Sequence, residues 1–94
     1  MKLVWTERAA ADLEAIEAYV AWDDPLAAIA LVDRLIERVD ALRDQPRMGR
    51  VVPEAANPDI RELIAGNYRL VYRIHGKTIE VLQVFEGHRL CREP

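Results

Sequence analysis

Apolar and polar residues alternate along residues 60–85, and this pattern predicts three consecutive β-strands. Two tight turns divide the stretch, at Gly66-Asn67 and at Gly76-Lys77. Glycine stands at the first central position of each turn, where a two-residue type II′ hairpin requires a positive φ. The alternation and the turns together predict an antiparallel unit around which the rest of the chain is organised.

Counting outward from the two turns predicts a strand register and two sheet faces. Four pairs should lie opposite each other: Leu63 with Leu70, Arg61 with Tyr72, Ile74 with Ile79, and Arg73 with Glu80. One face then carries the predicted core residues: Leu63, Tyr68, Leu70, Tyr72, Ile74, Ile79, Val81 and Phe85. The other face mixes aliphatic and charged side chains: Ile64, Arg69, Val71, Arg73, Glu80, Leu82 and Val84. Either loops or a tail cover this second face, or it binds a partner.

A short strand and a first helix are predicted upstream. The alternating run from Lys2 to Thr6 predicts a strand that joins the later three. Thr6 is a suitable N-cap for a helix that extends to about Trp22. The core side of this helix should carry Ala9, Leu13, Ile16 and Val20.

A second helix should begin at Asp24-Pro25, because an N-cap residue followed by proline is a helix-start signal. It should extend to about Asp44. Its apolar residues cover an arc of roughly 160°, wider than contact with one surface requires. We therefore expect it to contact both the first helix and the sheet, or the sheet and a partner. The segment from Pro46 to Pro58 follows and should be an irregular connection.

Length and composition indicate one small domain over residues 1–94. No apolar run approaches the roughly 20 residues of a membrane span, so no membrane association is expected. The single cysteine, Cys91, rules out an internal disulfide, and a cytoplasmic location is expected. The chain has no serine, no glycine-rich phosphate loop and no metal-ligand spacing, so we predict neither a metal nor a cofactor.

Charge is unevenly distributed along the chain. The net charge is −3, which argues against direct nucleic-acid binding. Residues 1–59 hold 7 basic and 12 acidic residues, whereas residues 60–94 hold 6 basic and 4 acidic ones. Arginine forks bind phosphates and carboxylates, so the basic residues of the second part are a candidate anion site. The candidate set consists of the five arginines Arg61, Arg69, Arg73, Arg89 and Arg92, together with His88. The alternative is that Arg73 pairs with Glu80 across the strands and the others are solvated.

The order of elements and two segments of the sequence resemble the ParE/RelE superfamily of bacterial type II toxins. The segments are PRMGRVVPE (Pro46–Glu54) and IRELIAGNYRLVYRI (Ile60–Ile74), of which Gly66 to Arg73 is the most specific part. The likeness covers essentially the whole chain. It implies an α+β fold in the order β-α-α-β-β-β, with a small antiparallel sheet and a two-helix hairpin on one face.

The resemblance implies one of two activities. RelE-type members cleave ribosome-bound messenger RNA, whereas characterised ParE-type members poison DNA gyrase. By the resemblance, Arg69, His88 and Arg89 would be the catalytic residues of a ribonuclease. However, the chain lacks the C-terminal tyrosine that several ribonuclease members carry, and it offers no clear general base. A ParE-like gyrase inhibitor, rather than an enzyme, is therefore predicted.

The resemblance also implies a cognate ParD-like antitoxin as partner and DNA gyrase as target. Target binding is predicted for Arg61, Arg69, Arg73, His88 and Arg89. Antitoxin binding is predicted for Ile64, Val71, Leu82 and Val84. Two alternatives stay open: a RelE-type endoribonuclease, and a member that binds antitoxin without being toxic.

Overall fold

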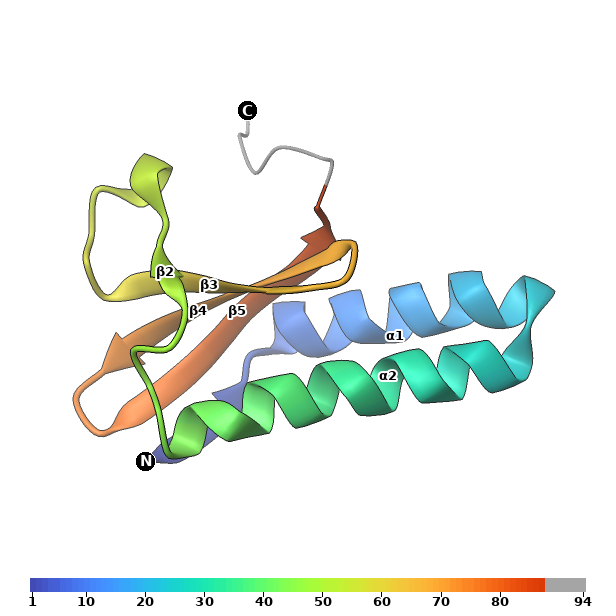
Figure 1. Ribbon diagram of the computed structural model, residues 1–94, viewed down its shortest axis with the longest axis horizontal. Coiled ribbons are helices and arrows are strands. Elements are labelled where there is room, and N and C mark those ends of the chain that lie inside the picture. Colours follow the sequence, from blue (N-terminus) through green and yellow to red (C-terminus); the bar gives the residue numbers. More distant parts are fainter. Residues whose placement is uncertain (88–94) are drawn as a thin grey trace.

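The chain folds into two layers, a five-stranded sheet and a helical hairpin that covers one of its faces (Figure 1). This arrangement comes from a computed structural model that describes residues 1–87. In chain order the elements are β1 (Lys2–Trp5), α1 (Glu7–Asp23), α2 (Pro25–Asp40), a 3₁₀ turn (Ala41–Arg43), β2 (Arg50–Val51), a second 3₁₀ turn (Pro53–Ala55), β3 (Ile60–Ala65), β4 (Tyr68–His75) and β5 (Thr78–Glu86).

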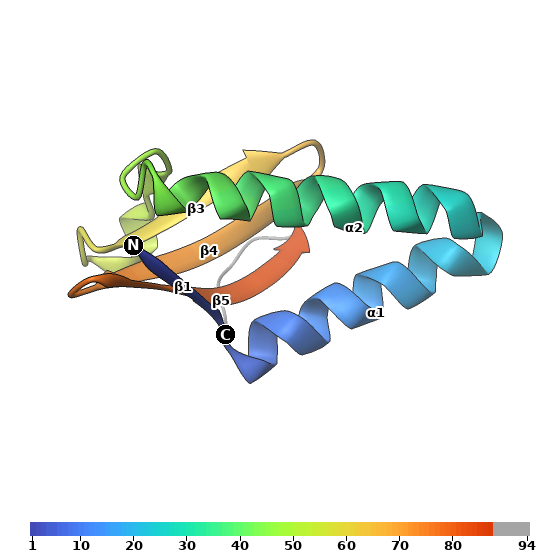
Figure 2. The same cartoon turned by 90° about the horizontal axis from the view of Figure 1, so that it is seen from below.

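The two helices begin where their capping residues predict. The Thr6 hydroxyl accepts a hydrogen bond from the Ala9 amide, and Asp24 accepts one from the Ala27 amide. Each cap satisfies a backbone donor that has no partner within its helix. The second helix is α-helical only to Asp40, and its predicted last turn is the 3₁₀ segment. In Figure 2 the far half of the hairpin extends beyond the end of the sheet.

The strands follow the order β1-β5-β4-β3-β2, and the sheet is mixed because β1 runs parallel to β5. Both predicted hairpin turns form, with a φ of 61° at Gly66 and at Gly76. The four predicted cross-strand pairs are all present. The connection from Pro46 to Pro58 is less irregular than predicted, because it contains β2, which pairs with β3.

A bulge in β5 changes the predicted faces of the last strand. Tyr72 lies opposite Val81, but Val71 lies opposite Gln83, so Leu82 is an extra residue on β5. An extra residue reverses the sides to which the following side chains point. The predicted positions of Val84 and Phe85 were therefore wrong. Val84 is 3% exposed and belongs to the core, whereas Phe85 lies opposite Arg69 on the other face.

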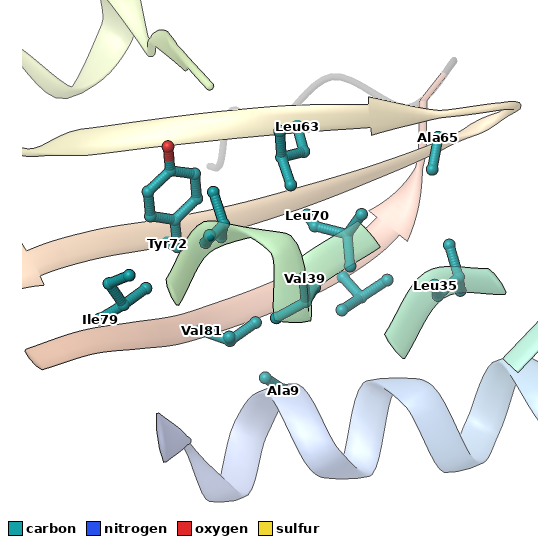
Figure 3. Packing of buried hydrophobic residues seen from close by; sticks show 11 residues of the cluster. Ala9, Leu35, Val39, Leu63, Ala65, Leu70, Tyr72, Ile79 and Val81 are labelled. Atoms are coloured by element: carbon teal, nitrogen blue, oxygen red, sulfur yellow. The ribbon is translucent and has the colours of Figure 1, made fainter. Parts of the chain in front are cut away.

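The core lies between the helical hairpin and the sheet (Figure 3). Figure 3 shows that Leu35 and Val39 of α2 and Ala9 of α1 point toward side chains of β3, β4 and β5. Leu70 and Ile79 are each at most 1% exposed. The opposite sheet face, which we call the open face, is not covered by any helix within residues 1–87. Of the wide apolar arc of α2, Ile29 and Ile36 remain 54% and 44% exposed.

Candidate functional site on the open sheet face

The open face is built around a buried carboxylate that sequence reasoning missed. Glu62 of β3 is only 4% exposed, although its side chain points away from the core. Its Oε2 atom accepts a hydrogen bond of 2.6 Å from Arg50 Nε of β2 and one of 3.2 Å from Arg69 Nη1 of β4. Two guanidinium groups therefore surround one carboxylate, which offsets much of the cost of burying its charge.

A second ion pair crosses from β4 to β5 on the same face. Arg73 donates from Nε and Nη2 to Glu80 Oε1, at 2.9 and 2.7 Å. The Arg73 and Glu80 side chains are 41% and 28% exposed, so the pair is only partly screened from solvent. This is the cross-strand pair that the register predicted.

Arg61 does not join this cluster. It lies opposite Tyr72, on the side of the sheet that carries the core. Its Nη1 donates to the carbonyl oxygens of Gly49 at 2.9 Å and Arg47 at 3.3 Å, whereas its buried Nε has no partner in the described part of the chain. Arg61 thus holds the connection before β2 in place and lies apart from Arg69 and Arg73.

Tyr72 fixes the same connection from inside the core. Its hydroxyl donates to the Pro46 carbonyl at 2.7 Å and accepts from the Gly49 amide at 2.9 Å. A Cβ atom at Gly49 would lie 2.6 Å from the Glu62 carbonyl oxygen and 2.7 Å from the Tyr72 hydroxyl, so only glycine fits there. The glycine of the PRMGRVVPE segment therefore lets β2 approach β3 and brings Arg50 to Glu62.

Arg69 also faces a small hollow of about 230 Å³ at the β3–β4 turn. Ile64, Gly66, Asn67 and Gly87 line the rest of it, and the Gly87 amide donates to the Asn67 carbonyl. Ile64 is 49% exposed beside Arg69. The hollow places an aliphatic side chain and a guanidinium group next to each other on the open face.

The other predicted antitoxin contacts are less accessible than Ile64. Val71 lies on the open face, opposite Glu62, but is 5% exposed. Leu82 is the bulge residue and is partly buried, and Val84 belongs to the core. His88, Arg89 and Arg92 lie outside the described residues.

The described residues offer little for catalysis. The one histidine within residues 1–87 is His75, at the β4–β5 turn. Arg69 lies six residues away along β4, about 20 Å at the usual rise per residue. No group of three or more side chains that could hold a metal ion exists among residues 1–87. No helix in this part of the chain is long and apolar enough to cross a membrane.

Comparison with known proteins gives the family. The family model described as the ParE toxin of the type II toxin–antitoxin system parDE matches residues 3–90. This chain belongs to the ParE toxin family. It is a toxin of the type II toxin–antitoxin class, as the sequence predicted.

Relatives of this ParE-family toxin cover nearly its whole length. It is 37% identical over 90 residues to protein Y4kP of Sinorhizobium fredii, and the aligned region covers 94% of this chain and 90% of that protein. It is 33% identical over 90 residues to Toxin RelE2 of Caulobacter vibrioides, and the aligned region covers 95% of this chain and 98% of that protein. A solved structure of the chromosomal ParDE system from P. aeruginosa is 30% identical, with a TM-score of 0.78 over 92% of this chain and 95% of that one. The predicted α+β fold is thereby confirmed.

Proposed function

We infer that this toxin poisons DNA gyrase and is neutralised by a ParD-like antitoxin. The observation that carries the inference is that the open-face arginines are already paired with carboxylates. Within residues 1–87, Arg50, Arg69 and Arg73 each already bond to a carboxylate of the same sheet. An arginine binds phosphate strongly when its fork is free, and a neighbouring carboxylate repels a phosphate.

RNA cleavage would need more than phosphate binding. Attack by a 2′-hydroxyl group requires a base, an acid and stabilisation of the charge that develops at phosphorus. Arg69 could supply only the last of these, and it shares its Nη1 with Glu62. The match to the ParE family model and the similarity to the P. aeruginosa ParDE structure also support a ParE-type activity.

A RelE-type endoribonuclease is the second candidate, because one relative is named Toxin RelE2. In that case Arg69, His88 and Arg89 would act on the RNA. A ribosome-bound message would then have to displace Glu62 from Arg69.

An antitoxin partner is supported by the family match and by the ParDE system of the structural neighbour. We place the contact on the open face, where Ile64 is half exposed beside Arg69. An acidic, amphipathic segment suits this surface, because its aliphatic anchors would hold the complex and its carboxylates would speed association.

The two activities can be separated by one set of experiments. The purified toxin is incubated with gyrase and supercoiled plasmid, and separately with translating ribosomes and messenger RNA. We expect linear DNA trapped with gyrase and intact RNA, and Arg69→Ala should leave RNA intact as well. Ribosome-dependent RNA cleavage that Arg69→Ala and His88→Ala each abolish would overturn the gyrase proposal. A toxin that binds its operon partner but attacks neither target would also overturn it.

A further inference from the structure

A second hollow lies on the other side of the sheet, between α1 and the end of β5. Its volume is about 460 Å³, within the range of roughly 300–1,000 Å³ that is usual for ligand pockets. It opens where β5 has no neighbouring strand on one side, because β1 ends at Trp5, opposite Val81. Asp12 of α1 approaches this edge and accepts a hydrogen bond of 2.9 Å from the Val84 amide.

Two tyrosines and two carboxylates, Asp12 and Glu86, are among the residues that line this hollow. Tyr19 of α1 is 83% exposed, and Tyr68 of β4 lies opposite Glu86 of β5. Burial raises the pKa of Tyr68, and the nearby Glu86 and Tyr19 raise it further. Glu86 forms no ion pair within residues 1–87. As far as the described residues extend, the hollow therefore presents aromatic rings next to a carboxylate that has no ion pair.

Among residues 1–87, Arg8 is the only cation that lines the hollow, and it is already engaged. Arg8 lies 3.6 Å from Asp12 and donates to the Gln83 side chain at 3.2 Å. The helical hairpin that forms one wall is strongly acidic, with nine acidic and three basic residues over residues 7–40, a net charge of −6. The exposed apolar residues Trp22 and Leu26 stand at its far end. A partner of this side of the molecule would therefore be basic and partly apolar.

We propose that the hollow between α1 and β5 receives an arginine or lysine side chain from a basic segment of a partner protein. The cation would lie against the rings of Tyr19 and Tyr68 and pair with the Glu86 carboxylate. Aromatic faces attract cations, and a carboxylate in a partly enclosed site strengthens the attraction. The open edge of β5 gives an extended segment a path to the hollow. This site is separate from the open face, and it requires neither gyrase nor RNA as the target.

The test uses two short capped peptides that differ in one residue. One has a central arginine between alanines and leucines, and the other has citrulline, a neutral side chain of the same shape. Binding to the full-length isotope-labelled toxin is followed by amide chemical shifts. We expect the arginine peptide to shift the amides around Tyr19 and Glu86, and to bind at least about fivefold more tightly than the citrulline peptide, as expected for a cation–π contact joined to an ion pair.

Two variants and one control make the result specific. Glu86→Gln removes the ion pair and should reduce the preference for the arginine peptide over the citrulline peptide, leaving only the part that the tyrosine rings supply. Tyr19→Leu, at an exposed position that should not affect folding, should weaken binding of the arginine peptide by about two- to fivefold. Glu17→Gln removes the same charge from an exposed position of α1 outside the hollow and should change little. Equal losses from Glu86→Gln and Glu17→Gln, equal binding of both peptides, or shifts confined to the open face would overturn the proposal.

Discussion

The two faces of the sheet are built on different principles. The helix-covered face is held by close packing of aliphatic side chains, with Leu70 and Ile79 almost fully buried. The open face is held by charge, with Glu62 between Arg50 and Arg69 and with Arg73 bonded to Glu80. The stability of the fold should therefore depend mainly on the first face, whereas the second can vary its surface with smaller losses. A binding surface benefits from that freedom.

The largest expected effect comes from shortening a side chain on the helix-covered face. Leu70→Ala should lower the free energy of unfolding by about 2–5 kcal/mol, because it leaves a cavity in a packed core. Ile64→Ala on the open face should cost at most about 1 kcal/mol, since Ile64 is half exposed. Urea unfolding of both variants measures the difference. Similar losses would show that the open face is packed as tightly as the core.

The buried carboxylate should give the next largest effect. Glu62→Gln keeps the shape of the side chain but removes the charge that both arginines bond, and it should cost about 1–3 kcal/mol. Glu80→Gln breaks the partly exposed pair with Arg73 and should cost about 1 kcal/mol or less. Both are measured by the same denaturation. If Glu80→Gln lowers the free energy of unfolding more than Glu62→Gln does, the burial of Glu62 does not determine how much its ion pairs contribute to stability.

The two pairs also differ in how far the sequence predicts them. Arg73 with Glu80 follows directly from a two-residue turn at Gly76. Glu62 with Arg69 is a diagonal contact in the preceding hairpin, between β3 and β4, and Glu62 was not among the residues that the sequence analysis assigned to a face. Continuing the predicted register from Ile64 to Glu62 would have put Glu62 on the same face as Arg69 and located this contact. The contact between Arg50 and Glu62 could not have been predicted in this way, because β2 is only two residues long and its sequence shows no alternation.

The helices and most of the sheet were predictable because local signals agree with the global fold. Thr6 and Asp24 cap the helices, and the glycine turns fix the hairpin register. The bulge at Leu82 was not predictable, since counting from a turn assumes that no extra residue intervenes. That single residue moved Val84 into the core and Phe85 to the open face. Val84, one of the four residues predicted to contact the antitoxin, therefore lies in the core and not on the open face.

A smaller effect is expected on antitoxin binding. If the open face binds the antitoxin, Ile64→Asp should weaken the complex by about tenfold or more, because it places a charge at an apolar anchor. Ile36→Asp is a matched control, since Ile36 is an equally large residue of similar exposure on α2. Leu82→Asp should also weaken antitoxin binding, to a similar or smaller extent than Ile64→Asp. Arg92→Ala should weaken it far less. Titration with the operon partner at physiological salt, on variants shown to be folded, measures these affinities. A larger loss from Ile36→Asp would assign the antitoxin to the helices instead.

The smallest predicted effect is the change of stability with alkaline pH. It tests the helix-covered face through the buried phenol of Tyr72. Burial raises the pKa of Tyr72 above its ordinary value of 10.0, and the Gly49 hydrogen bond and the charges of Arg61 and Arg47 lower it in part. Below pH 10 both the folded and the unfolded chain keep the phenol proton, so the contribution of Tyr72 to stability is constant. Above pH 10 the unfolded chain loses the proton first, and stability falls until the folded-state pKa is reached.

Urea unfolding between pH 8 and pH 11 measures this fall. Tyr72→Phe removes the titrating group, so its stability should decrease less steeply above pH 10 than that of the unchanged protein. At pH 8 the same variant should be less stable by about 1–3 kcal/mol, because the buried Gly49 amide loses its acceptor. Tyr68 also has a raised pKa, and adding Tyr68→Phe should flatten the curve further. An unchanged alkaline slope in both variants would mean that these tyrosines ionise as readily in the folded chain as in the unfolded one.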